Sequence, residues 1–192
     1  MAHIDFAERR VTLKLASHGR FTSGWGSGGR IWFVRLYEHL PRAQKGELRI
    51  EVMQGDQHAS FEYRPPRLPG APQQFEYVFH LLGYNPNSYF KATRKLALEG
   101  ADGVLFVVNA DPSWQEGNAE MAADLAEFVP AEVPRVLAWT NRGQPDAVPR
   151  ERLEAFNATG APWVPVDDPE MLVVAVRTLG DLAIAQFART YG

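Results

Sequence analysis

The stretch RVTLKLASHGRFTSGWGSGGRIWFVRLYEHLP, residues Arg10 to Pro41, decides the fold class. Its first eight residues alternate between apolar and polar side chains, which predicts a β-strand. Residues 30–40 have the apolar spacing of a helix, and Pro41 ends it because proline has no backbone N–H to donate. A glycine-rich loop joins the two elements, as in sites that bind phosphate at the start of a helix.

The rest of the chain continues this pattern of strands and helices. We expect strands at 47–53, 59–65, 75–82, 103–110, 135–141 and 161–166, and helices at 89–98, 113–128, 150–156 and 169–190. Alternating strands and helices predict a parallel sheet covered on both faces, and the strand-rich stretch 47–82 predicts an antiparallel edge. The fold class is therefore three-layer α/β, with ligands expected at the carboxyl ends of the strands.

Composition limits the classes of function. A chain of 192 residues predicts a single domain over 1–192, and a net charge of −3 argues against a nucleic-acid partner. The absence of cysteine excludes disulfides and thiolate chemistry. No long uninterrupted apolar run is present, so we expect no integral membrane segment and a cytoplasmic location.

The loop has the glycine spacing of a phosphate-binding loop but not its chemistry. Four residues separate Gly19 from Gly24, and after the second glycine such a loop continues with Lys and then Ser or Thr. Here Trp25 and Gly26 follow, so the ammonium and the Mg²⁺-binding hydroxyl are both missing. Gly19, Gly24, Gly26 and Ser27 are kept as residual nucleotide-binding positions; the alternative is a glycine-rich turn without a ligand.

Four segments resemble the bacterial small Ras-like GTPases of the gliding-motility MglA family. They are HIDFAERRVTLKLASHG (3–19), LYEHLPRAQKGEL (36–48), FKATRKLALEGADGVLFVVNA (90–110) and TNRGQPDAVP (140–149). The resemblance implies a Ras-like P-loop GTPase fold with an extra N-terminal strand, and binding of GTP and GDP with Mg²⁺. It also implies a role in cell polarity and a partner that is a dimer of Roadblock domains.

At most of the family's functional positions this sequence has a different residue. The glycine that senses the γ-phosphate falls on Pro86, which has no N–H, and the glutamine that orients water falls on Asn87. In the base-reading loop Asn141 is kept, but Arg142 and Gln144 replace the lysine and the aspartate. The first switch carries Gln54 or Gly55 where the family has a Mg²⁺-binding threonine, and His58 near its catalytic arginine.

These losses together predict a catalytically inactive pseudo-GTPase that needs no cofactor and acts through a protein partner. We expect no catalytic residue and no metal site. The aromatic Trp25 is a candidate to fill the emptied pocket, and the candidate partner-binding residues are His58, Phe61, Tyr84, Tyr89 and Phe90. The alternative is a divergent switch that binds GTP or GDP with Mg²⁺ through substitute residues.

Three local expectations concern packing. Only one of Trp32 and Phe33 should be fully buried, because adjacent residues on a helix point about 100° apart. His80 lies in an apolar strand and should be a core residue. Asp167 and Asp168 precede Pro169 and should form the turn and the N-cap of the last helix.

Overall fold

The computed structural model of the chain describes residues 2–19, 29–53, 56–66, 72, 74–84, 91–166 and 168–191. The strands are β1 (His3–Asp5), β2 (Arg10–Gly19), β3 (Arg49–Met53), β4 (Asp56–Tyr63), β5 (Glu76–Tyr84), β6 (Gly103–Asn109), β7 (Arg135–Thr140) and β8 (Trp163–Pro165). The helices are α1 (Gly29–His39), α2 (Lys91–Leu98), α3 (Gln115–Phe128), α4 (Arg150–Leu153) and α5 (Pro169–Tyr191), and 3₁₀ turns span Arg42–Gln44, Pro112–Trp114 and Glu154–Phe156.

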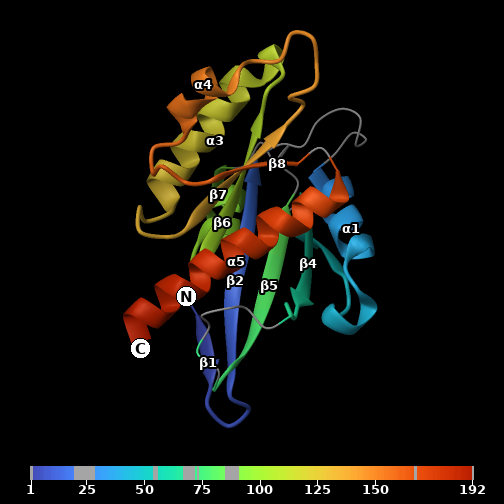
Figure 1. The fold of residues 1–192 in the computed structure, drawn as a ribbon, viewed down its shortest axis with the longest axis vertical. Coiled ribbons are helices and arrows are strands. Elements are labelled where there is room, and N and C mark those ends of the chain that lie inside the picture. Colours follow the sequence, from blue (N-terminus) through green and yellow to red (C-terminus); the bar gives the residue numbers. More distant parts are fainter. Residues whose placement is uncertain are drawn as a thin grey trace.

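The strands form one mostly parallel sheet in the order β3-β4-β5-β2-β6-β7-β8, with β1 paired to β2. From β5 through β8 in that order every pairing is parallel, and β3 and β4 extend the sheet as an antiparallel hairpin. The predicted α/β class and antiparallel edge are confirmed. The carboxyl ends of the parallel strands meet at one end of the sheet, the upper end in Figure 1.

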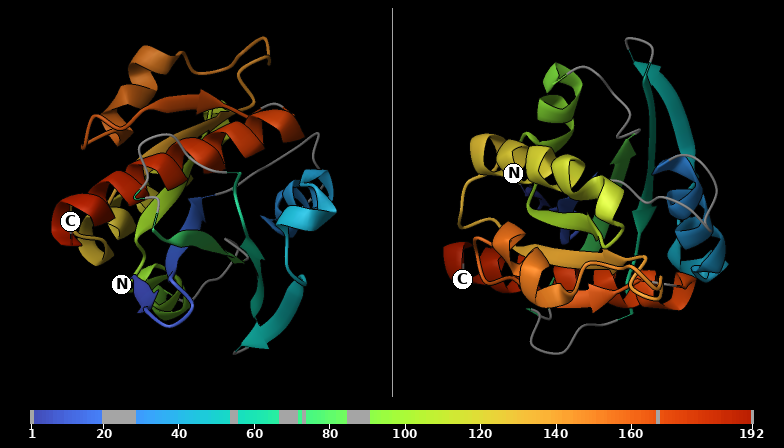
Figure 2. Two further views of the ribbon diagram at one scale, coloured as in Figure 1. Left: turned by 60° about the horizontal axis from the view of Figure 1, so that its bottom comes forward. Right: turned by 90° about the horizontal axis from the view of Figure 1, so that it is seen from above.

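Helices cover the sheet on both faces, which makes three layers. Figure 2, seen from above, shows α1 and α5 on one side of the strands and α2 and α3 on the other. Each face has its own apolar core. The side with α1 and α5 buries Leu13, Phe79 and Leu179, and the side with α2 and α3 buries Phe106 and Leu125.

Both aromatic residues at the start of α1 are buried, contrary to the expectation for Trp32 and Phe33. Trp32 is 3% and Phe33 is 1% exposed, and their rings meet edge to face with centroids 5.3 Å apart. The physical reason is that α1 packs against the sheet and against α5, so two adjacent sides of the helix are covered. Gly83 in β5 makes room for the Phe33 ring, since a Cβ atom there would lie 2.6 Å from it.

The last helix, α5, crosses the sheet diagonally in Figure 1. The N-cap expected at Asp168 is confirmed, because its carboxylate accepts a hydrogen bond from the Met171 backbone N–H at 2.9 Å; Asp167 lies outside the described residues. By length and a mean hydropathy of 1.5, α5 passes the test for a membrane-spanning helix. A core helix passes the same test, and α5 buries Leu172, Leu179 and other apolar residues against the sheet.

Candidate functional site

The candidate site lies where the parallel strands end. There, β2 ends at Gly19, β5 at Tyr84, β6 at Asn109 and β7 at Thr140. Ligands of open α/β sheets bind beyond these carboxyl ends. Gly24, Trp25, Gly26 and Ser27 follow β2 in the sequence, but they lie outside the described residues, so their roles stay predictions.

Gly19 begins the loop in a conformation that requires glycine. Its φ angle is +108°, and a Cβ atom there would lie 2.3 Å from the backbone carbonyl oxygen of Val107 in β6. A side chain at this position would therefore collide with the neighbouring strand. Glycine is thus required at the end of β2, the position at which a phosphate-binding loop would begin, although the lysine that normally follows the second glycine is missing from the sequence.

Asn141, directly after β7, belongs to a cluster of three asparagines with Asn109 at the end of β6 and Asn118 in α3. Its φ angle is +58°, and its side-chain Nδ2 donates to Oδ1 of Asn109 at 2.9 Å. The Asn109 backbone N–H in turn donates to Oδ1 of Asn118 in α3 at 3.1 Å, and Nδ2 of Asn118 donates back to the Asn109 carbonyl at 2.8 Å. The cluster fixes the loop that follows β7, while Arg142 and Gln144 stay exposed there.

A second polar cluster joins the ends of β2 and β5. The imidazole of His18 is buried, and its Nε2–H donates to the Met121 backbone carbonyl at 2.9 Å. Its Nδ1 therefore carries no proton and accepts the hydroxyl of Tyr84. Burial lowers the pKa of His18 from 6.5 to about 4 and raises the pKa of Tyr84. Both side chains are therefore neutral at pH 7, and their hydrogen bonds connect β2, β5 and α3.

Beside His18 and Tyr84, ion pairs connect α2 to α3. Arg94 pairs with the buried carboxylate of Asp124 and, at 2.7 Å, with the exposed carboxylate of Glu120. Asn118, His18 and Arg94 were not singled out from the sequence. No signal in the sequence marks them, because each depends on the register between segments far apart along the chain.

Three of the five candidate partner-binding side chains are buried. Phe61 is 2% exposed and stacks edge to face on Phe33, because its position on β4 points to the face covered by α1. Tyr84 is 5% exposed in its pair with His18, and His58 is 8% exposed. Their side chains therefore offer little surface to a partner. The other two, Tyr89 and Phe90, lie outside the part of the chain that the structure describes.

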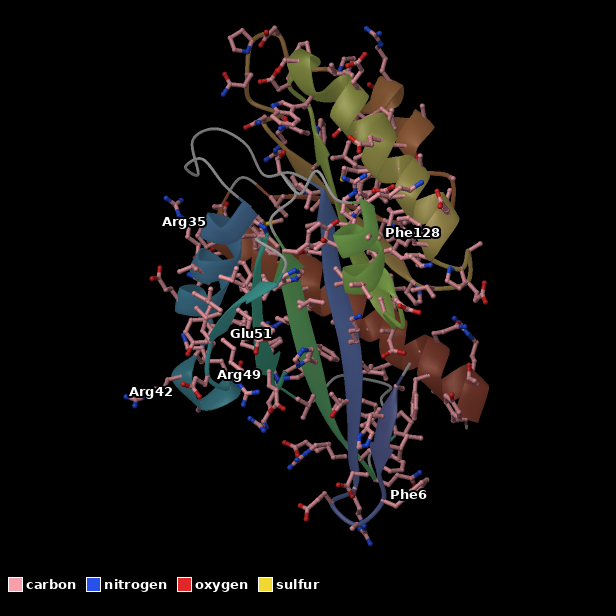
Figure 3. All side chains as sticks on the ribbon, turned by 180° about the vertical axis from the view of Figure 1, so that it is seen from behind. Phe6, Arg35, Arg42, Arg49, Glu51 and Phe128 are labelled. Carbon is pink, nitrogen blue, oxygen red and sulfur yellow. The ribbon has the colours of Figure 1, made fainter. Side chains whose placement is uncertain are left out.

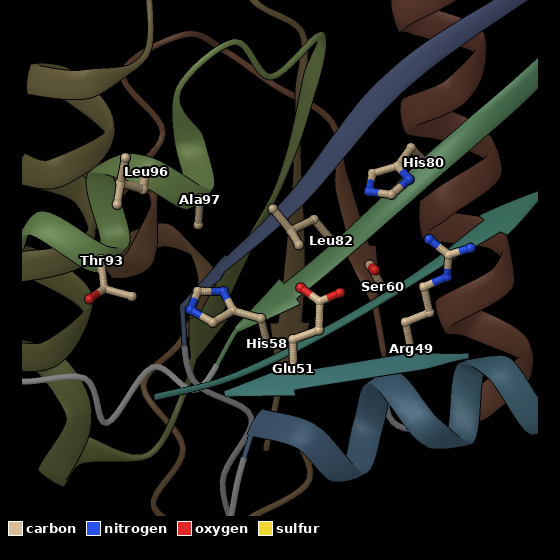
Figure 4. Close-up of a pocket in the computed structure, with 9 residues that line it drawn as sticks. All are labelled: Arg49, Glu51, His58, Ser60, His80, Leu82, Thr93, Leu96 and Ala97. Atoms are coloured by element: carbon tan, nitrogen blue, oxygen red, sulfur yellow. The ribbon is translucent and has the colours of Figure 1, made fainter. Parts of the chain in front are cut away.

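His58 lines a cavity of about 270 Å³ between α2 and the strands β3, β4 and β5. Figure 4 shows its imidazole between Thr93 of α2 and the carboxylate of Glu51. Nε2 of His58 and the hydroxyl of Thr93 are buried without a hydrogen-bond partner among the residues that the structure describes. His80 lines the same cavity and is half-buried rather than a core residue, because its side chain faces this cavity; its partial burial lowers its pKa.

Among the residues that the structure describes, no three histidine, aspartate or glutamate side chains are grouped to hold a metal ion. One acidic residue near the candidate site has its carboxylate occupied by local hydrogen bonds. Asp111, which follows β6, accepts hydrogen bonds from the backbone N–H of Ser113 at 2.9 Å and from its hydroxyl at 2.6 Å, and these bonds lower its pKa.

Comparison with known proteins gives one informative relative. The chain is 27% identical over 169 residues to the Mutual gliding-motility protein MglA of Myxococcus xanthus, an alignment that covers 84% of each chain. No protein-family model matches the chain. The length of this alignment and the mostly parallel sheet with its helices on both faces together support a relationship with the small Ras-like GTPases.

Proposed function

We propose that the chain is a pseudo-GTPase, a nucleotide-independent relative of the small Ras-like GTPases that acts as a protein-interaction or regulatory module. The observation that carries the proposal is the absence of lysine from the whole segment between Lys14 and Lys45. This segment includes the Gly19 turn, the glycine loop and α1. A phosphate-binding loop needs its lysine because charge-assisted hydrogen bonds to phosphate are among the strongest that proteins make.

Losses at other positions point the same way. Pro86 has no N–H for the γ-phosphate, and Gln144 stands where the related GTPases place the carboxylate that reads guanine. The glycine loop also lacks the Mg²⁺-binding hydroxyl directly after the lysine position, where Gly26 stands. Removing the counter-charge and the metal ligand together should weaken triphosphate binding by several kcal/mol.

The partner that we propose is a Roadblock-domain dimer, and the process is cell polarity or motility in the cytoplasm. The name of the relative includes the words gliding motility, which supports a role in motility. The family resemblance supports the Roadblock-domain partner. Because His58, Phe61 and Tyr84 are buried, the contact would fall on side chains of the same region that stay exposed, namely Lys91, Lys95 and Leu96 of α2. Leu96→Glu should then weaken the complex in sedimentation velocity, with Glu38→Arg on α1 as the control.

A divergent nucleotide switch is the second candidate. The glycine-only conformation of Gly19 and the Asn109–Asn141 hydrogen bond favour it, because both are features that the framework of a nucleotide site would need, although the loop has lost its lysine. Such a switch would take GTP or GDP with Mg²⁺, and arginines would supply the positive charge. It predicts a melting temperature that rises with nucleotide concentration above Kd.

One experiment separates the two candidates. The protein is denatured and any released nucleotide is quantified by ion exchange, and native protein is titrated with fluorescent GTP and GDP with and without Mg²⁺. The pseudo-GTPase proposal expects no released nucleotide and no saturable binding. Guanine nucleotide near one per chain, or micromolar affinity, would contradict it. The matched variant Trp25→Lys with Gly26→Thr restores the missing groups and should gain affinity.

A further inference from the structure

The edge strand β3 is open to solvent. It pairs with β4 on one side, and no described segment pairs with its other side. Two apolar side chains on it are exposed, Ile50 at 42% and Val52 at 67%. Proteins usually protect such an edge with lysine, proline or a bulge, because its free N–H and C=O groups pair readily with another strand. Within β3, Arg49–Met53, neither lysine nor proline occurs.

When two copies of this strand are aligned in antiparallel fashion, apolar residues face apolar residues and opposite charges face each other. Around Ile50, the apolar Leu48 and Val52 stand at equal distances, and so do the oppositely charged Arg49 and Glu51. We propose that a second copy of this chain pairs with β3 in antiparallel fashion, with the two-fold axis at Ile50. Arg49 of each copy then faces Glu51 of the other, and Leu48 faces Val52.

The side chains fall on the correct faces for this pairing. Arg49 and Glu51 are opposite Ser60 and His58 of β4 and project to the side of the cavity, as Figure 4 shows. Ile50 is opposite Ala59, which belongs to the core on the side of α1 and α5. The dimer would therefore join charged residues on one face and continue the apolar core on the other.

The backbone also has the orientation that the pairing needs. Two residues lie between Met53 and Asp56, which are opposite each other at the end of the β3–β4 hairpin. In a two-residue hairpin this closing pair exchanges both backbone hydrogen bonds, and the pairs alternate from there. Met53 and Glu51 thus direct their N–H and C=O groups to β4. The groups of Val52 and Ile50 face the open edge, where Ile50 meets Ile50 of the second copy.

Electrostatics favours a second copy over an unrelated strand. Neither Arg49 nor Glu51 forms a hydrogen bond or an ion pair with any described residue, so both charges are available. Figure 3 labels both on the outer strand of the sheet. Opposite charges directly across an antiparallel pair stabilise it, and like charges destabilise it. Two such pairs form in the dimer, one on each side of the axis.

A contact limited to one short strand is small. It falls below the area of a standard stable interface, so we expect a reversible dimer with micromolar affinity rather than a permanent one. The proposal concerns the open edge of the sheet and is independent of whether the chain binds nucleotide.

Charge-swap variants of the full chain test the proposal in sedimentation velocity over a range of protein concentrations. The wild type should dimerise as its concentration rises. Arg49→Glu and Glu51→Arg should each be monomeric, because each alone places like charges opposite each other at both pairs. An equal mixture of the two variants should form a heterodimer, because one supplies only acidic groups and the other only basic groups. The double variant should dimerise like the wild type.

Two controls keep the outcome clear. Glu38→Arg makes the same kind of charge change on α1 and should leave the dimer unchanged, and circular dichroism of every variant checks the fold. A wild type that stays monomeric at all concentrations overturns the proposal. So does a single variant that dimerises like the wild type, or a mixture that stays monomeric, since the pairs would then lie elsewhere.

Discussion

The hydroxyl of Tyr84, at the end of β5, donates a hydrogen bond to Nδ1 of His18, near the end of the neighbouring β2. The other ring nitrogen of His18 donates to the carbonyl of Met121 in α3. One imidazole thus connects two parallel strands and a helix at the end of the sheet where ligands bind in related folds. The candidate site rests on this buried connection, since both strands continue from it into the loops.

Tyr84→Phe should destabilise the protein by about 1–3 kcal/mol, because it leaves the buried Nδ1 of His18 without a donor. The control is Tyr77→Phe. Tyr77 is buried too, but its hydroxyl has no hydrogen-bond partner within the described part of the chain, so its removal should be neutral or slightly stabilising. Urea unfolding at pH 7 measures both variants. Equal losses for the two would show that the His18–Tyr84 hydrogen bond contributes nothing to stability.

Because of His18, the free energy of unfolding should decrease as the pH is lowered from 6.5 to about 4. Burial lowers its pKa from 6.5 to about 4, so between these values the unfolded chain binds a proton that the native chain does not. The free energy of unfolding is then constant above pH 6.5 as far as His18 is concerned. It decreases as the pH falls through the window, by up to about 3 kcal/mol in total.

Unfolding curves at several pH values, compared with those of His18→Gln, measure this contribution. The variant should lose the His18 part of the slope, while His39→Gln, a change at an exposed residue of α1, should keep it. If His18→Gln does not fold, the NMR titration of the wild-type imidazole gives the pKa directly. A midpoint near 6.5 would contradict the prediction.

Much of the fold could be predicted because the strands carry local signals. The continuous apolar run Val104–Val108 predicts a central strand, and the alternation around Leu13 predicts β2. The start of α3 was predicted less accurately. The α-helix does not begin at Ser113. The Asp111 carboxylate caps a 3₁₀ turn that includes Ser113, and the α-helix follows from Gln115.

The contacts around the candidate site could not be predicted from the sequence, because they depend on the register between distant segments. His18 and Tyr84 are 66 positions apart along the chain and meet only because β2 and β5 pair in parallel. Aromatic residues near a switch region favour a binding surface on average, yet Phe61 shares a face with Ala59 and packs into the core. Which side of a strand is covered depends on helices that the strand's own sequence does not reveal.

Gly19→Ala should destabilise the protein by at least about 2 kcal/mol. The new methyl group would lie 2.3 Å from the Val107 carbonyl oxygen at a φ angle of +108°, so β2 or β6 must shift. The comparison is Gly143→Ala, where a Cβ atom meets nothing within 4 Å and the loss should be small. Thermal unfolding measures the loss of stability in both variants. A Gly19→Ala protein with unchanged stability would mean that the strand end adjusts freely.

The ion pair between α2 and α3 offers a sharper test of the same region. Arg94→Met should cost about 3–5 kcal/mol, because it leaves the Asp124 carboxylate buried without its partner. Arg94→Met combined with Asp124→Leu should recover most of the loss, since no buried charge then remains. A further ion pair between these helices, Lys91 with Glu127, is exposed on both sides, so Lys91→Met should cost less than about 1 kcal/mol. Urea unfolding of the four proteins measures the differences. Recovery in the double variant would show that the penalty comes from the unpaired carboxylate, whereas a double variant as unstable as Arg94→Met would mean that the packing of the arginine side chain carries the stability.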